Sequence, residues 1–378
     1  MFPRPSLAGL LPTATLIAGA SGVLTTPGAA QGPVPVLVPV PSDATSATVF
    51  LVGDAGVIND ERTRLLEHLG RAADSIQRAA PDRPTATVFL GDNIYDEGIR
   101  PDHRAEDIGI LVEQVTLGGL GGAMPTYFIS GNHDWGDGGD GNEGLDRVEA
   151  QRIALDSLGA AAGRVARLLP APGCPGPETV DLGRSLRMVF VDTEWMIRRA
   201  ESCGENPRAT LLGGLTRELG SVRDRPALIL AHHPLETGGP HGGGGSLLDQ
   251  IWKWLSRGRQ DLGSSRYDEM VDDLIDAVGI SDHDRVMIAS GHEHSLQVID
   301  VEEDGVDFVQ IVSGSGAKFS SVDDRDGTLF AAKRRGYVKL DVDGPSVRVT
   351  AFGLEDGEVR ELWTGSLFPA TPPPSAGS

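Results

Sequence analysis

Seven side chains of types that bind metal ions follow short apolar runs of this sequence, each close to the point where a run ends. The runs are 49–52, 87–90, 127–129, 228–230 and 286–288. The side chains are Asp54, Asp92, Tyr95, Asn132, His232, His292 and His294. Carboxylate, phenol and amide oxygens with imidazole nitrogens are sufficient donors for two metal ions that share one carboxylate. The pattern therefore predicts a dinuclear metal site.

Taken singly, each of these residues has a simpler interpretation. Asp54 and Asp92 could be helix N-caps, a common role for Asp after a strand, and a lone His is more often structural. A cap does not need the glycine that precedes both Asp54 and Asp92, whereas a glycine lets the backbone approach a metal closely. His292 and His294 are two residues apart, so in an extended chain they point the same way. Recurrence at five strand ends favours the metal site.

Parallel strands joined by helices would bring these donors together. Ligands in open α/β sheets gather at the carboxyl ends of the strands. Apolar runs predict strands at 48–52, 85–90, 127–129, 187–191, 228–230 and 286–288. Helical spacing predicts helices at 61–80, 105–115, 145–158, 211–219 and 266–278. This alternation indicates βαβ units. After residue 297, runs separated by Asp-Gly turns predict antiparallel hairpins at 298–299, 308–312, 337–342, 347–352 and 359–363.

The ends of the chain differ from its middle. Residues 1–30 combine Arg4, an apolar stretch interrupted by Pro12, and small residues at 28–30, and so predict a secretory signal peptide. A membrane anchor is the alternative, which Pro12 disfavours. We interpret residues 31–47 as a Pro-rich linker, 48–366 as one enzyme-like domain and 367–378 as a disordered tail. The expected location is secreted or periplasmic, with no stable membrane insertion after signal removal.

Charge and cysteine usage limit the partners. The 378 residues hold 33 Lys and Arg against 54 Asp and Glu, a net charge of −21 that makes nucleic acid an unlikely partner because phosphate backbones are repelled. Small anionic substrates remain possible, because bound cations dominate the field inside a metal site. We expect a monomer. Cys174 and Cys203 are a candidate disulfide in an exported protein, with two free thiols as the alternative.

Five motifs of the sequence resemble those of the calcineurin-like metallophosphoesterases, over about residues 48–365. They are Asp54-Ala55-Gly56, Gly91-Asp92-Asn93-Ile94-Tyr95, Gly131-Asn132-His133-Asp134, His232 and Gly291-His292-Glu293-His294. Most of that superfamily has His at the position of Gly56, and a Tyr at the position of Tyr95 is typical of purple acid phosphatases. The motif set is most similar to the small, tartrate-resistant type.

The resemblance implies a fold, a cofactor and a reaction. The fold is an α/β (α+β) four-layer αββα sandwich, in which helices flank two mixed β-sheets and the metal site lies at the carboxyl ends of strands. Asp54, Tyr95 and His294 would hold Fe(III), and Asn132, His232 and His292 would hold Fe(II), Zn(II) or Mn(II). Asp92 would bridge the two ions. The binuclear enzyme would hydrolyse phosphate monoesters by attack of a metal-bound hydroxide.

Two further histidines would handle the substrate. His133 adjoins Asn132 and is the candidate general acid, and His241 matches a substrate-side His of the family by its spacing from His232. Asp134 would orient a ligand or His133. The alternatives are a phosphodiesterase on the same scaffold and a catalytically silent module that binds metal or phosphate.

Three departures from the small-type pattern concern the leaving-group preference. Ala55 stands where a Trp is usual, and His233 where a Tyr is common. Residues 247–265 resemble an insertion. Its Trp252 and Trp254 would pack on the sheet or shape a substrate mouth.

Overall fold

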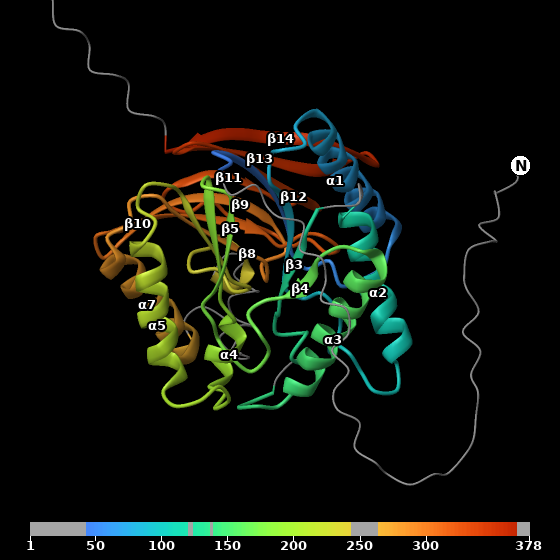
Figure 1. Ribbon diagram of the computed structural model, residues 1–378, viewed down its shortest axis with the longest axis horizontal. Coiled ribbons are helices and arrows are strands. Elements are labelled where there is room, and N and C mark those ends of the chain that lie inside the picture. Colours follow the sequence, from blue (N-terminus) through green and yellow to red (C-terminus); the bar gives the residue numbers. More distant parts are fainter. Residues whose placement is uncertain (1–42, 120–123, 137–138, 243–263, 369–378) are drawn as a thin grey trace, which may run out of the picture. The chain divides into compact units, whose positions relative to one another are not determined.

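The structure is a computed structural model that describes residues 43–119, 124–136, 139–242 and 264–368, all of which belong to one compact unit, Pro35–Ser378. The predicted signal peptide, residues 31–42 of the linker, residues 369–378 of the tail and the stretch with Trp252 and Trp254 lie outside these residues. The unit contains two mixed seven-stranded sheets (Figure 1).

The first sheet has the strand order β14-β13-β12-β1-β2-β3-β4. Its strands are β1 (Ser46–Val52), β2 (Thr85–Leu90), β3 (Thr126–Ile129), β4 (Ala166–Leu168), β12 (Gly336–Asp343), β13 (Ser346–Glu355) and β14 (Glu358–Leu367). The four strands β1 to β4 are parallel to one another, whereas β12, on the other side of β1, pairs antiparallel with it. The hairpins β12–β13 and β13–β14 complete the edge, as the Asp-Gly turns predict.

The second sheet has the order β11-β9-β10-β8-β7-β6-β5. Its strands are β5 (Glu178–Leu182), β6 (Leu186–Phe190), β7 (Ala227–Leu230), β8 (Val286–Ser290), β9 (Leu296–Glu303), β10 (Val306–Ser313) and β11 (Thr328–Ala332). Strands β6, β7, β8 and β10 are parallel, and the outer strands pair antiparallel. The predicted C-terminal hairpins therefore extend both sheets.

Helices cover the outer faces of the two sheets. They are α1 (Asp60–Ala79), α2 (Arg104–Gly118), α3 (Leu145–Ala162), α4 (Thr193–Arg198), α5 (Pro207–Gly220) and α7 (Ser265–Ser281), and a 3-10 turn, η1, spans Pro240–Gly242. Helices α1 and α3 contact strands of the first sheet, and α7 contacts the second (Figure 1). The sequence analysis placed all of these helices except α4, which is too short to show a helical period and begins where Asp192 caps the Trp195 N–H.

Alternate residues of the central strands enter different cores. Val49 and Leu51 of β1 pack with Leu228 and Leu230 of β7 in the layer between the sheets, whereas Phe50 faces the helices. Strands buried on both faces are typical of parallel sheets covered by helices. The predicted αββα sandwich is confirmed.

Two further expectations concern the second half of the unit and the membrane. Cys174 and Cys203 form a disulfide, with their Cα atoms 5.0 Å apart, so the paired alternative is confirmed. Among the helices of the described residues, none is long and apolar enough to cross a bilayer.

Candidate metal centre

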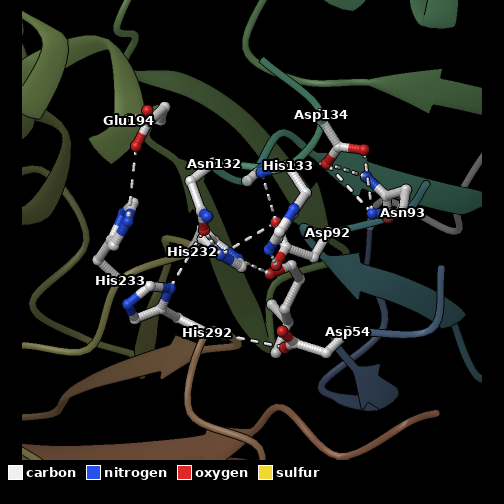
Figure 2. Close-up of polar contacts among 12 residues, drawn as sticks. Asp54, Asp92, Asn93, Asn132, His133, Asp134, Glu194, His232, His233 and His292 are labelled. Atoms are coloured by element: carbon white, nitrogen blue, oxygen red, sulfur yellow. Dashed lines mark hydrogen bonds and ion pairs between the residues drawn. The ribbon is translucent and has the colours of Figure 1, made fainter. Parts of the chain in front are cut away.

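The carboxyl ends of five strands, three from one sheet and two from the other, carry the predicted ligands. In the first sheet, Asp54 follows β1, Asp92 and Tyr95 follow β2, and Asn132 follows β3. In the second sheet, His232 follows β7, and His292 and His294 follow β8. Figure 2 shows Asp54, Asp92, Asn132, His232 and His292 turned toward one another. The structure thus brings all seven positions to one place.

The first group of donors surrounds the Tyr95 hydroxyl. This oxygen lies 2.9 Å from Asp54 Oδ1, 2.9 Å from Asp92 Oδ2 and 3.2 Å from His294 Nε2. His294 Nε2 lies 3.3 Å from Asp54 Oδ1. The other oxygen of Asp54 accepts the His292 N–H at 2.9 Å, which fixes the carboxylate with Oδ1 toward this group.

The second group of donors surrounds the Asn132 side-chain oxygen. Asn132 Oδ1 lies 3.1 Å from His232 Nε2 and 3.2 Å from His292 Nδ1. Asp92 Oδ1 is 3.4 Å from His232 Nε2, so the two oxygens of Asp92 face different groups. This is the arrangement expected of a carboxylate shared by two cations.

Two contacts show that these side chains suit a bound cation better than they suit one another. His232 Nδ1 lies 2.8 Å from the Leu90 carbonyl oxygen, which can only accept, so Nδ1 donates there and Nε2 is left facing the centre. Nε2 faces two oxygens, Asn132 Oδ1 and Asp92 Oδ1. The Tyr95 hydroxyl has one proton for the two carboxylates beside it. A cation satisfies every one of these electron pairs.

The chemistry of the donors also fits. Ligand atoms of Asp54, Asp92 and His232 lie within 4.8 Å of one another, and all three residues are buried. Carboxylate and phenolate oxygens favour a hard ion, and imidazole and amide donors suit a softer divalent ion.

Electrostatics around the two aspartates follow from burial. Burial, Asp54 and Asp92 raise the pKa of the Tyr95 phenol well above its usual value. A bound cation opposes this by stabilising the phenolate. Burial also disfavours the charge of Asp92, but the neighbouring His232 and His133 hold the pKa of its carboxyl below the usual range.

Glycines leave the space that the ligands occupy. A Cβ atom on Gly56 would lie 2.8 Å from Tyr95 Cδ2, so a side chain at position 56 and the Tyr95 ring exclude each other. Such a Cβ would also lie 2.7 Å from the Asp92 carbonyl oxygen, so the backbone of the second motif likewise requires glycine at position 56. A Cβ atom on Gly131 would lie 2.4 Å from Asp92 Oδ1.

Three of the seven positions have left-handed backbone conformations. The φ angles are 56° at Asp54, 51° at Asp92 and 64° at His292. Such angles cost side-chain-bearing residues about 1–3 kcal/mol each and tend to occur at functional sites. Three of the ten non-glycine residues with positive φ in the described part of the chain therefore lie at the centre.

Asp134 connects the loops that carry the ligands. Its carboxylate accepts the N–H groups of Gly131 at 2.9 Å and Ile94 at 3.1 Å. It also accepts the Asn93 N–H at 3.0 Å (Figure 2). Burial and the charge of Asp92 raise the pKa of Asp134 well above its usual value. These contacts fix the backbone of the loops that carry Asp92 and Asn132, and the orientation of a ligand or of His133 by Asp134 stays a prediction.

Both substrate-side histidines lie at the centre. His133 Nδ1 donates to the Asp96 carbonyl at 2.6 Å, which turns Nε2 toward Asp92 Oδ2, 3.9 Å away. The His133 side chain is 22% exposed, so a substrate can reach it. His241 lies in η1, and its ring centre is 4.3 Å from that of His292.

Sequence reasoning missed a buried network behind the centre. His233 Nδ1 lies 2.8 Å from Thr193 Oγ1, and His233 Nε2 is 3.6 Å from Glu194 (Figure 2). The His233 ring is 4.5 Å from the His292 ring. The His-His pair was the available signal, but its partners belong to the short helix α4, which the sequence did not reveal.

A lysine at the rim was also missed. Lys318 Nζ lies 3.4 Å from the centre of the Tyr95 ring. No motif marks this residue.

Comparison with known proteins rests on structure. No protein-family model and no curated protein matches the sequence. A structure of GAP50, the anchor in the inner membrane complex of Plasmodium, matches with a TM-score of 0.54 and 15% identity over 86% of this chain and 89% of that chain. The purple acid phosphatase PPD1 from yellow lupin (Lupinus luteus) seeds matches with a TM-score of 0.54 and 16% identity over 87% of this chain.

The match covers 55% of the lupin protein, so this chain corresponds to about half of it. A protein named PhoD matches with a TM-score of 0.53 and 12% identity over 86% of this chain and 73% of that chain. The chain has the calcineurin-like metallophosphoesterase fold. Identities of this size concern the fold alone.

Within the calcineurin-like fold, Ala55 and His233 occupy buried positions next to the centre. The Ala55 carbonyl accepts hydrogen bonds from Arg62 and Gln114, which fix the loop after β1. Ala55 belongs to the core on the helix side of the first sheet, and His233 contacts Thr193 and Glu194 of α4. Both departures change the surroundings of the ligands while all seven donors are kept.

Proposed function

We propose that this chain is a binuclear metallophosphoesterase that hydrolyses phosphate monoesters in the manner of a purple acid phosphatase. The observation that carries the proposal is the convergence of seven donors from two sheets around Asp92, whose oxygens face two donor groups. The proposed reaction is direct hydrolysis, because the Asp and His side chains of both groups would be engaged as metal ligands and no covalent protein nucleophile is needed.

In this proposal the two donor groups hold different ions. Asp54, Tyr95 and His294 would hold Fe(III), and Asn132, His232 and His292 would hold Fe(II), Zn(II) or Mn(II). Asp92 would be shared by the two ions. When bound, such a pair of ions lowers the pKa of a coordinated water and neutralises the charge that develops on the phosphoryl oxygens.

The remaining chemistry belongs to side chains of the rim. The Asp96 carbonyl holds the Nδ1 proton of His133, so the Nε2 atom of the imidazolium is the one that delivers a proton to the leaving oxygen. General acid catalysis of this kind contributes about 10²–10⁴-fold. His241, next to His292, orients the substrate from the other side.

The proposal includes a location and partners. We infer export to a secreted or periplasmic location, supported by the Cys174–Cys203 disulfide, because disulfides persist in oxidising compartments. The substrate is a small phosphorylated molecule. We infer a monomer that binds no nucleic acid, given the net charge of −21.

Metal analysis, a visible spectrum and two assays test the function. Iron-loaded protein should show a tyrosinate-to-iron charge-transfer band and hydrolyse nitrophenyl phosphate faster than bis(nitrophenyl) phosphate. Tyr95→Phe is the control, which should lose the band while keeping the circular dichroism of the folded chain. Faster diester hydrolysis would identify a phosphodiesterase instead, and two bound metals with no turnover would identify a silent binding module.

A further inference from the structure

The loop from Gly314 to Ser320 lies along the metal centre and is held at both ends by the loops that carry ligands. The Gly316 N–H donates to the Gly53 carbonyl at 3.0 Å, and the Ala317 N–H donates to the Asp54 carbonyl at 3.0 Å. On the other side, the Ser320 N–H donates to the His294 carbonyl at 2.7 Å. Lys318 lies between these attachments, so its backbone is positioned by two proposed ligands.

The side chain of Lys318 is half-buried and ends over the Tyr95 ring, with Nζ 3.4 Å from the ring centre. A cation over an aromatic face is favourable in itself. An ammonium over the centre of this ring is also near the Tyr95 hydroxyl and the donors around it. The charge of Lys318 also acts on His294. Burial lowers the pKa of the His294 imidazole, but Asp54 raises this pKa above its usual value, and the positive charge of Lys318 partly offsets the effect of Asp54.

Lys318 has no carboxylate partner among the residues that the structure describes. Lys339, for comparison, pairs with Asp341 at 2.8 Å. A lysine ammonium keeps three donors in a compact charge, which suits a phosphate oxygen.

We propose that Lys318 contacts the phosphoryl group of the bound substrate and selects the dianionic monoester over the monoanionic diester. This inference rests on the proposed function. The selection follows from charge, because a fixed cation attracts a dianion about twice as strongly as a monoanion at the same distance.

The test compares three variants of the full, metal-loaded chain. Lys318→Met removes the charge and Lys318→Arg keeps it. Lys333→Met is the matched control, because it makes the same change in net charge at an exposed lysine whose ammonium lies 6.0 Å from the Phe319 ring. Calorimetry measures the Kd for inorganic phosphate, and assays measure kcat/KM for a nitrophenyl monoester and its diester.

Lys318→Met should weaken phosphate binding by about ten- to hundredfold, the range for a hydrogen bond to a charged group. The monoester-to-diester ratio of kcat/KM should fall by about three- to tenfold. The reason is that the ammonium attracts the monoanionic diester only half as strongly as the dianionic monoester, so its removal harms the monoester more. Lys318→Arg and Lys333→Met should stay close to the parent protein. Thermal unfolding of each variant shows that the comparison is made on folded chains, and Lys318→Gln replaces Lys318→Met if the latter fails to fold.

An unchanged phosphate Kd and an unchanged ratio in folded Lys318→Met would overturn the inference, as would equal losses in Lys333→Met. The outcome is separable from the proposed function. If the parent protein binds phosphate but hydrolyses neither ester, the proposed function fails, and the calorimetric comparison still decides whether Lys318 contacts phosphate. A parent protein that binds no phosphate would refute both.

Discussion

The two sheets supply different chemistry to the same centre. The first sheet contributes only oxygen donors to the proposed ligand set, from Asp54, Asp92, Tyr95 and Asn132. The second sheet contributes only nitrogen donors, from His232, His292 and His294. Neither sheet alone holds a set that could satisfy two ions, so the centre exists only where the sheets are packed together.

This division has two consequences. Hydrogen bonds cross between the sheets at the centre, as when His232 Nδ1 donates to the Leu90 carbonyl and the His292 N–H donates to Asp54. The metal ions would then link the two sheets in addition to the apolar layer between them. The second consequence is that each sheet can be disabled separately by substitution of its own donors.

The largest effect is expected from Asp92→Asn. Asp92 is the one residue whose two oxygens face both donor groups, and the amide replaces one of them with a donor. Substitution of a residue that only supports a ligand typically lowers metal affinity by about 10–100-fold. We expect a larger loss of affinity when a ligand shared by both ions is substituted. Metal analysis should find fewer than two ions per chain, with monoester hydrolysis near background. Retention of two ions would contradict the shared role of Asp92.

A pair of variants sharpens the comparison between the sheets. Asp54→Ala removes an oxygen donor of the first sheet, and His292→Ala removes a nitrogen donor of the second. Asp54→Ala should lose Fe(III) together with the charge-transfer band. His292→Ala should keep the band and lose the divalent ion, with an affinity loss of about 10–100-fold or more. Metal analysis and the visible spectrum, measured on both proteins, check this. Equal loss of both ions in both variants would show that the division of donors has no functional meaning.

The comparison also explains what the sequence could reveal. The oxygen donors lie within short motifs at the ends of β1, β2 and β3, where an apolar run stops abruptly, and the nitrogen donors follow β7 and β8 in the same way. Local patterns of this kind predicted most strands and most helices, and the resemblance of the motifs implied the αββα sandwich. The positions of His133 and His241 beside the centre agree with the same analysis.

Features that depend on contacts between distant segments were not predictable. Lys318 meets Tyr95 through a loop that carries no motif. His233, which follows β7, meets Glu194 of α4, a short helix that packs against α7. Strand β4 is three residues long, and β5 has polar residues on a partly exposed edge, so neither has a clear apolar period. In each case the determining interaction is tertiary.

The smallest of the expected effects concerns stability, and it follows from removal of the metals. Ligands that bind only the folded state stabilise it by RT ln(1 + [L]/Kd), about 2.7 kcal/mol at a hundred times Kd. Chelation should therefore lower the free energy of unfolding by an amount of this order. If the ions link the sheets, hydrogen exchange should accelerate together at the carboxyl ends of β1 and β2 and of β7 and β8. The hairpin β13–β14, at the edge of the first sheet, is the internal control and should exchange at the same rate. Acceleration confined to one sheet would mean that the ions stabilise that sheet alone, and the donors of the other would then be dispensable for the link.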